Sequence, residues 1–265
     1  MRENRIRTLW QEGKAVVNGW LAIPSAFSAE VMAHQGWDTL TVDLQHGAID
    51  YQSALTMFAA ISTTGTVPMA RVPWNDPGIL MKVLDAGAYG VICPMVNTAD
   101  DARKLISATR YPPLGARSLG PIRASLYAGD DYARHANDTV VILAQIETRE
   151  ALANVDDILA VEGLDGVYIG PADLSLSFGC TAAFDEVDPP VAQAIDHILA
   201  RAKACGKVAC VHNGSTKYAL ERIAKGFQLV TISSDARLIA AGAQAVIREM
   251  REGSPDIAQD KGGLY

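Results

Sequence analysis

The stretches VVILAQIE (residues 140–147) and GVYIGPAD (residues 166–173) decide the fold of this 265-residue chain. Each is a short apolar run that continues directly into a polar turn, and the pattern recurs along the sequence. Runs that are apolar on both alternating faces are typical of parallel strands covered by helices on both sides. We predict eight such strands, at residues 19–24, 39–44, 67–72, 90–95, 140–146, 166–169, 208–211 and 229–233.

Amphipathic stretches predicted to be helical lie between these strands, at residues 28–35, 51–63, 77–86, 99–109, 190–204, 216–224 and 236–250. Ser28 and Asp76 are candidate N-caps, and the expected helix stops are glycines at 36, 87, 206 and 226. Such alternation predicts parallel strands joined by right-handed crossovers. Eight units in this length favour a closed (β/α)8 TIM barrel, and no GxGxxG motif follows the first strand.

The composition predicts a single globular domain over residues 1–265. Apolar residues make up 49% and charged residues 20%, with a net charge of −7 and no Lys/Arg-rich block, so we expect no nucleic-acid partner. No apolar run approaches the ~20 residues that span a bilayer, and the first residues lack a signal-peptide core. Four cysteines without a CxxC pair predict reduced thiols in a cytoplasmic protein.

Two segments depart from the strand–helix alternation. Residues 111–138 contain a Pro-Pro pair, three glycines and three arginines without a clean helical period, which is typical of a functional or assembly loop. The polar, Gly-rich tail over residues 253–265 is expected to be mobile or docked on a neighbouring subunit.

Polar side chains follow the strands at one end of the predicted barrel, where the loops after the strands carry the chemistry of this fold. Asp43 and His46 follow the second strand, Arg71 the third, Glu147 the fifth and Asp173 the sixth. Any one of them could be a loop capping group. Their coincidence at the carboxyl ends of the strands predicts an active site.

Glu147 and Asp173 follow adjacent strands and therefore point towards the same place above the barrel. Two unpaired carboxylates there would repel each other, and a divalent cation would remove the conflict while leaving positions for water and substrate. A general acid/base pair of carboxyls is the alternative chemistry. The structural alternative is that both are helix N-caps, which suits Asp173 better because a helix-like segment follows it.

Arg71 and His46 complete the predicted site. A guanidinium at a strand end suits a carboxylate or a developing enolate, although Arg71 could instead pair with a loop acid. His46 is a candidate base whose imidazole a hydrogen bond to Asp43 could orient, and His212 is a weaker pocket candidate. No lysine lies at a strand's carboxyl end and no GxSxG occurs, so imine catalysis and a covalent serine or cysteine nucleophile are not expected.

Six motifs in order resemble the HpcH/HpaI aldolase family: VDLQHG (42–47), PMARVP (68–73), LDAGAYGVICPMV (84–96), YPPLGARSLGP (111–121), QIE (145–147) and GPADLS (170–175). The resemblance covers residues 19–247. It implies a metal-dependent class II pyruvate aldolase, similar to 4-hydroxy-2-oxoheptanedioate and 2-dehydro-3-deoxyglucarate aldolases. It also implies a TIM barrel assembled as a homohexamer, a trimer of dimers with the C-terminal helix swapped between subunits.

The same resemblance implies roles for individual residues. Glu147 and Asp173 would ligate the divalent metal (Mg²⁺, Mn²⁺ or Co²⁺), and Gln145 with the backbone N–H groups of Ala172 and Asp173 would hold pyruvate. Arg71 would stabilise the enolate and His46 would be the base. The resemblance also gives Asp85 the role of tuning His46, within one chain or across a subunit interface. It gives Trp20 the role of a pocket wall, for which core packing is the alternative.

Gln45 departs from the family's pattern, and Arg123 resembles a feature of a subgroup of the family. Gln45 stands where many members carry a glutamate before the histidine, and Arg123 is expected to read a distal polar or carboxylate group on the aldehyde. The predicted reaction is reversible cleavage of a 4-hydroxy-2-oxo acid to pyruvate or hydroxypyruvate and an aldehyde through a metal-stabilised enolate. The alternatives are a CoA-thioester lyase of the citrate lyase or malyl-CoA lyase type and a non-catalytic keto-acid-binding barrel.

Overall fold

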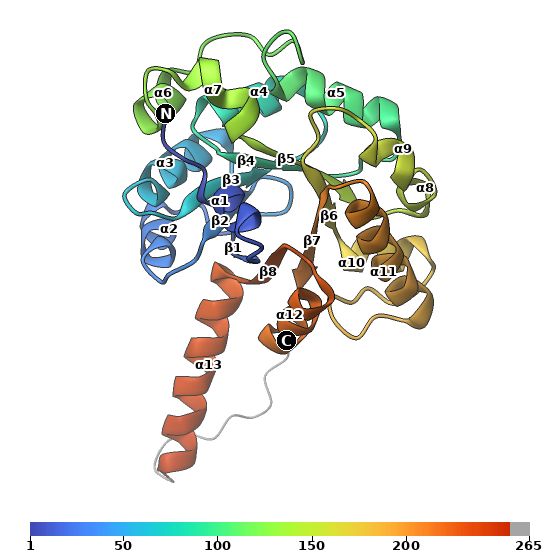
Figure 1. Ribbon diagram of the computed structural model, residues 1–265. Coiled ribbons are helices and arrows are strands. Elements are labelled where there is room, and N and C mark those ends of the chain that lie inside the picture. The colour runs from blue at the N-terminus through green and yellow to red at the C-terminus, as the bar shows by residue number, and fades with distance from the viewer. Residues whose placement is uncertain (255–265) are drawn as a thin grey trace.

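Eight parallel strands form a closed barrel in which each strand pairs with the next and β8 returns to β1 (Figure 1). The computed structural model describes residues 1–254, so residues 255–265 of the predicted tail lie outside the described part. The strands are β1 Val16–Leu21, β2 Thr39–Asp43, β3 Val67–Arg71, β4 Gly90–Cys93, β5 Val141–Ile146, β6 Gly166–Ile169, β7 Val208–Asn213 and β8 Leu229–Ser234. The predicted (β/α)8 barrel is confirmed.

The first strand is displaced from its prediction by three residues. It begins at Val16 and ends at Leu21, whereas we predicted residues 19–24. The backbone N–H groups of Ala22 and Ile23 donate to the carboxylate of Asp235 at 2.8 and 3.2 Å instead of extending the ladder. A side chain from the far end of the sequence therefore ends this strand, which no local pattern could indicate.

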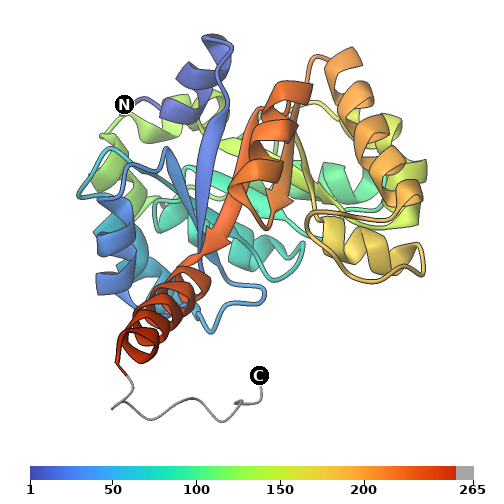
Figure 2. The ribbon, with the colours of Figure 1, turned by 90° about the horizontal axis from the view of Figure 1, so that it is seen from below.

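The main helices match the predicted segments within a few residues, and all of them except α13 pack around the barrel (Figure 2). They are α2 Ala26–Ala33, α3 Tyr51–Ile61, α4 Pro77–Asp85, α5 Ala99–Thr109, α11 Pro189–Ala204, α12 Thr216–Lys225 and α13 Asp235–Gly253, with α1 Arg5–Gln11 before the first strand. Asp76 caps α4 as predicted, but Ser25 and not Ser28 caps α2. Gly226 ends α12 in the left-handed conformation at φ 107°, which favours glycine.

The segment over residues 111–138 contains two helices that the sequence analysis did not predict, α6 Ile122–Ala128 and α7 Tyr132–Thr139. The buried guanidinium of Arg117 connects this segment to the barrel, because it donates to Asp85 at 2.7 Å and to the Tyr132 hydroxyl at 2.9 Å. Buried polar contacts therefore hold the segment together with the core packing of Ala124, Ala128 and Ala136.

Three more short helices follow β5 and β6: α8 Arg149–Ala153, α9 Val155–Leu159 and α10 Pro171–Ser177. The N-cap of α8 is Thr148, and the N-cap of α10 is Gly170. Neither Glu147 nor Asp173 is therefore a helix N-cap, and the structural alternative for these two acids is wrong.

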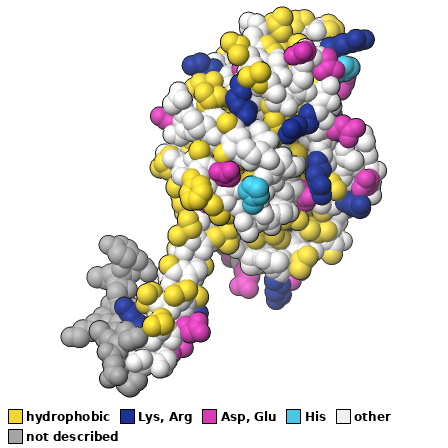
Figure 3. All heavy atoms as spheres, turned by 90° about the vertical axis from the view of Figure 1, so that its left-hand side faces the viewer, with side chains coloured by type: hydrophobic (Ala, Val, Ile, Leu, Met, Phe, Trp, Pro, Cys, Tyr) yellow, Lys and Arg dark blue, Asp and Glu magenta, His cyan; other side chains and the backbone are white. Residues whose placement is uncertain are grey.

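The last helix, α13, projects from the barrel (Figure 1). Asp235 at its start is its only buried residue among those described. Figure 3 shows hydrophobic side chains along its exposed surface, which include Leu238, Ile239, Val246, Ile247 and Met250. Among the described residues, no helix has the length and apolar character that crossing a membrane requires.

Candidate active site

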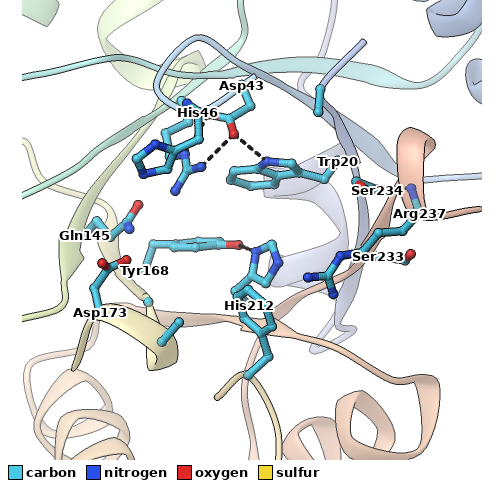
Figure 4. A pocket seen from close by; sticks show the side chains of 15 residues that line it. Trp20, Asp43, His46, Gln145, Tyr168, Asp173, His212, Ser233, Ser234 and Arg237 are labelled. Atoms are coloured by element: carbon cyan, nitrogen blue, oxygen red, sulfur yellow. Dashed lines mark hydrogen bonds and ion pairs between the residues drawn. The ribbon is translucent and has the colours of Figure 1, made fainter. Parts of the chain in front are cut away.

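A cavity of about 400 Å³ opens where the strands end (Figure 4). Gln145 and Asp173 lie together on one side of it, and Ser233, Ser234 and Arg237 lie on the opposite side. Its lining combines residues from most of the strands: Trp20, Ala22, Asp43, His46, Arg71, Gln145, Tyr168, Gly170, Ala172, Asp173, Phe184, His212, Ser233, Ser234 and Arg237. The cavity thus gathers most of the predicted site residues from distant parts of the sequence.

Asp43 and Arg71 form an ion pair through two hydrogen bonds. Arg71 Nε donates to Asp43 Oδ1 at 2.8 Å and Nη2 donates to Oδ2 at 2.6 Å. Burial alone would raise the pKa of Asp43, but the bonds and charge of Arg71 outweigh it and lower the pKa below its usual value. The acid is therefore ionised and fixes the guanidinium, and Arg71 lines the cavity.

Trp20 contacts both members of this ion pair. Its indole N–H donates to Asp43 Oδ2 at 3.0 Å, and the Arg71 guanidinium carbon lies 4.7 Å from the centre of its ring. Trp20 therefore lines the cavity and orients Arg71 by hydrogen bonding and cation–π contact. Trp20 is only 4% exposed, so it packs in the core as well as lining the cavity. The two roles considered from the sequence are therefore compatible.

His46 reaches the cavity from the loop after β2. Asp43 Oδ1 accepts the backbone N–H of Gln45 at 3.1 Å and of His46 at 3.3 Å, which turns the loop back over the strand end. Within residues 1–254, Asp43 makes no hydrogen bond to the imidazole of His46. The expectation that Asp43 orients this ring is therefore wrong. The reason is that both oxygens of Asp43 are already occupied by Arg71, Trp20 and the backbone.

Glu147 and Gln145 form a buried hydrogen-bonded pair, and Gln145 lies on the same side of the cavity as Asp173. Glu147 Oε1 accepts the Met95 N–H at 2.8 Å, and Oε2 accepts from the Gln145 amide. Burial raises the pKa of Glu147, the bonds from Met95 and Gln145 lower it, and the neighbouring charge of Asp173 raises it further, with a net rise. The charge of Asp173 therefore disfavours the ionised form of Glu147.

The residues around Glu147 fit a divalent cation. The Gln145 Oε1 atom is buried without a hydrogen-bond partner, and a Cβ atom at Gly170 would lie 2.9 Å from Glu147 Oε2 and 3.0 Å from Gln145 Nε2. A side chain at Gly170 would therefore fill the space beside these groups. Hard oxygen donors suit Mg²⁺ or Mn²⁺. Within residues 1–254 there is no group of three or more His, Cys, Asp or Glu arranged for a metal, so a cation here would keep positions for water and substrate.

Several residues that line the cavity away from Gln145 and Asp173 were not predicted from the sequence. The Tyr168 hydroxyl lies 3.0 Å from His212 Nδ1, and Arg237 stacks 5.0 Å from the ring centre of Phe184. His212, the weaker candidate, does line the cavity. Tyr168 lies within β6, two residues before the polar turn, and Arg237 lies just beyond β8, so an inspection of inward strand positions would have found the tyrosine.

Asp85 and Arg123 do not reach the cavity within one chain. Asp85 is the last residue of α4, and Arg123 donates to the carbonyl of Ala86 at 2.6 Å and to the Ser62 hydroxyl at 2.9 Å. Helix ends of this kind lie at the amino-terminal end of the barrel strands, because the helices run antiparallel to the strands. The expected aldehyde contact of Arg123 is therefore not supported by its position.

The cavity lining contains no lysine among the described residues, so imine formation has no amine there. A fixed guanidinium and two acids suited to a divalent cation fit the class II aldolases, metal-dependent enzymes of the lyase class. The chain belongs to the HpcH/HpaI aldolase/citrate lyase family, whose sequence model matches residues 18–241.

Two relatives illustrate the similarity in sequence. A hydroxypyruvate/pyruvate aldolase of Rhizorhabdus wittichii is 46% identical over 248 residues, which cover 94% of this chain and 99% of the relative. A 4-hydroxy-2-oxo-heptane-1,7-dioate aldolase of Salmonella dublin is 38% identical over 247 residues, covering 92% and 93% of the two chains. Both similarities extend across the whole barrel.

Solved structures agree with the fold. An HpcH/HpaI aldolase/citrate lyase family protein from Burkholderia cenocepacia has a TM-score of 0.87 at 29% identity, covering 94% of this chain and 99% of that one. A citrate lyase beta subunit of M. tuberculosis, complexed with oxaloacetate and magnesium, has a TM-score of 0.56 at 16% identity over 85% and 95% of the chains. The second likeness concerns the fold alone.

Proposed function

We propose that this aldolase reversibly cleaves 4-hydroxy-2-oxo acids into an aldehyde and pyruvate or hydroxypyruvate. The observation that carries the proposal is that Arg71 and Gln145 line one cavity, while the charge of Arg71 acts on the buried Glu147. Relatives named for hydroxypyruvate, pyruvate and 4-hydroxy-2-oxo-heptane-1,7-dioate support this class of substrate. The CoA-thioester lyase and the non-catalytic barrel are not favoured, because these relatives are aldolases.

The 2-oxo acid is held on the side of the cavity formed by β5 and α10. Pro171 starts α10, so the N–H groups of Ala172 and Asp173 have no partner within the helix and Gly170 supplies no side-chain cap. These N–H groups bind the substrate carboxylate together with the Gln145 amide. Glu147 and Asp173 hold the divalent cation, which when bound polarises the 2-oxo group as a Lewis acid.

His46 and Arg71 perform the bond cleavage. His46 takes the proton from the C4 hydroxyl, the C3–C4 bond breaks, and C4 leaves as the aldehyde carbonyl. The electron pair of the broken bond enters the enolate of the 2-oxo acid, whose negative oxygen is stabilised by the fixed charge of Arg71. Protonation at C3 gives the free 2-oxo acid, and condensation reverses each step.

A retro-aldol assay with a 4-hydroxy-2-oxo acid tests this function through the release of pyruvate. We expect activity with added Mg²⁺, Mn²⁺ or Co²⁺, none in excess chelator, and a fall of two or more orders of magnitude in Arg71→Ala. Arg103→Ala, on the exposed face of α5, is the matched control. Full activity in chelator, or a covalent adduct trapped by borohydride with pyruvate, would contradict the proposal.

We also propose that the protein is a homo-oligomer, a hexamer of three dimers, in which α13 packs against another copy. An apolar groove beside its base is lined by Phe27, Val31, Leu238 and Ile239, and the exposed apolar residues of α13 continue from it. Such a surface is typical of a subunit contact. Asp85 would approach His46 only through a second copy of the chain.

Light scattering after size exclusion tests this assembly. Ile239→Asp should dissociate the oligomer, whereas Leu220→Asp on α12, where the leucine is equally exposed, should not. A monomeric wild-type protein would contradict the assembly.

A further inference from the structure

His212 contacts aromatic and hydroxyl groups in the cavity but uses only one of its two ring nitrogens. Its ring centre lies 5.1 Å from that of Trp20 and 5.0 Å from that of Phe184. Nδ1 lies 3.0 Å from the Tyr168 hydroxyl, and Nε2 has no hydrogen-bond partner among the described residues. Because the partly exposed ring lines the cavity, a bound molecule can reach Nε2.

The protonation of Nδ1 follows from a chain of hydrogen bonds that begins at Asn18 inside the barrel. The Asn18 amide nitrogen faces the carbonyl oxygens of Gly19 at 3.1 Å and Thr39 at 3.2 Å, the orientation that satisfies its surroundings. Backbone carbonyls only accept hydrogen bonds, so this end of the amide must be the donor. The Asn18 oxygen therefore faces the Thr231 hydroxyl at 2.8 Å.

Each hydroxyl in the chain has a single hydrogen to donate. Thr231 donates its hydrogen to the Asn18 oxygen, because two oxygens at 2.8 Å without a hydrogen between them would repel. Thr231 therefore accepts from the Tyr168 hydroxyl at 2.7 Å. Tyr168 has then used its only hydrogen, so it accepts from His212 Nδ1–H.

The His212 ring stays neutral with this tautomer. Burial, with the positive charges of Arg71 and Arg237, lowers the pKa of His212 to about 3. A neutral ring with hydrogen on Nδ1 has a lone pair on Nε2. The cavity consequently offers a hydrogen-bond acceptor at Nε2 and not a donor.

We propose that His212 Nε2 accepts a hydrogen bond from a hydroxyl group of the substrate and makes His212 a specificity-determining residue. This inference rests on the proposed aldolase function. The hydroxyl belongs either to the 2-oxo acid, as in hydroxypyruvate, or to the aldehyde. Tyr168, Thr231 and Asn18 are positioning residues that fix the tautomer.

Competing pairs of substrates distinguish the two sources of the hydroxyl. We compare kcat/KM for hydroxypyruvate and pyruvate with one aldehyde, then for glycolaldehyde and acetaldehyde with one 2-oxo acid. His212→Phe, which keeps an aromatic ring without an acceptor, should lower the preference for the hydroxylated member of one pair by roughly tenfold. The pair that responds identifies the source of the hydroxyl.

His212→Gln is the matched variant, because its side-chain oxygen can still accept a hydrogen bond. It should retain more of the preference than His212→Phe. Equal preferences in the wild type and His212→Phe for both pairs would overturn the role of His212 while leaving the aldolase function intact. Absence of aldol cleavage by the wild type with every substrate would instead contradict the proposed function.

Nitrogen NMR of protein labelled with ¹⁵N-histidine tests the tautomer without any turnover. The wild type should show a ring with protonated Nδ1 and unprotonated Nε2 at neutral pH, and this signal should be missing from His212→Phe. Tyr168→Phe removes the acceptor and should mix the tautomers. A proton on Nε2 in the wild type would overturn the inference.

Discussion

Asp43 and Arg71 face each other in the register of β2 and β3, and their side chains form a two-bond ion pair at the mouth of the barrel. Asp43 is buried, and it also accepts a hydrogen bond from the indole of Trp20. A guanidinium held in this way is already oriented before substrate binds, which is the condition for strong stabilisation of a developing negative charge.

Replacing Asp43 should impair catalysis more than it changes the shape of the site. Asp43→Asn keeps the size of the side chain but removes the charge that fixes Arg71, and misplacement of such a group costs about a hundredfold in rate. We therefore expect kcat/KM in the cleavage assay to fall by one to two orders of magnitude. Asp157→Asn, at an exposed position of α9, is the control, and an equal effect in both variants would contradict the role of the pair.

Metal affinity should increase with pH through the titration of Glu147. Because burial and Asp173 raise the pKa of Glu147, its carboxylate is protonated at pH values where a free glutamate, with a pKa of about 4.3, is ionised. A cation binds the ionised form, so calorimetry should show Mn²⁺ affinity rising as pH increases through this pKa. Glu147→Gln should bind weakly at every pH, whereas the exposed Glu150→Gln should behave as wild type.

Gly170 should tolerate no side chain. Gly170→Ala brings a methyl group to within 3.0 Å of the Glu147 and Gln145 side chains, so both must move. We expect metal affinity and kcat/KM each to fall by at least tenfold, by calorimetry and by the cleavage assay. At Gly65, an added Cβ meets nothing within 4 Å, so Gly65→Ala should have no such effect.

Asp85 should contribute to stability through Arg117. The Arg117 side chain is 0% exposed, and Asp85→Asn would leave its charge without an ionised partner, at a cost of about 3 kcal/mol in the free energy of unfolding. Urea denaturation measures this cost. If Asp85 also tunes His46 of a neighbouring copy, the acid limb of the pH profile of kcat/KM should move to lower pH. An unchanged limb would restrict Asp85 to its bond with Arg117.

The sequence predicted the barrel and the end of it that carries the site, because apolar strand runs and the polar residues that follow them are local patterns. It predicted the adjacency of Glu147 and Asp173 from the order of β5 and β6. It could not predict that Asp43 bonds the side chain of Arg71 and not the imidazole of His46, since that choice depends on the register of β2 against β3 and on the competing donors around the acid.

Local sequence patterns could not predict the contacts across the barrel either. Tyr168, His212 and Thr231 meet because β6, β7 and β8 curve around one interior, and no spacing in the sequence indicates their hydrogen bonds. Arg123 was predicted to reach the cavity but does not. It follows a motif of the family closely in sequence, but α6 carries its side chain to the ends of α3 and α4, away from the cavity.

The most direct test of the account is anomalous diffraction from crystals soaked in Mn²⁺. We predict one peak within about 2.2 Å of a carboxylate oxygen of Glu147 and of Asp173. The Asp173→Asn variant should lose or weaken the peak. A well-occupied soak that shows no peak between these two acids, or a peak only elsewhere in the protein, would contradict the central claim.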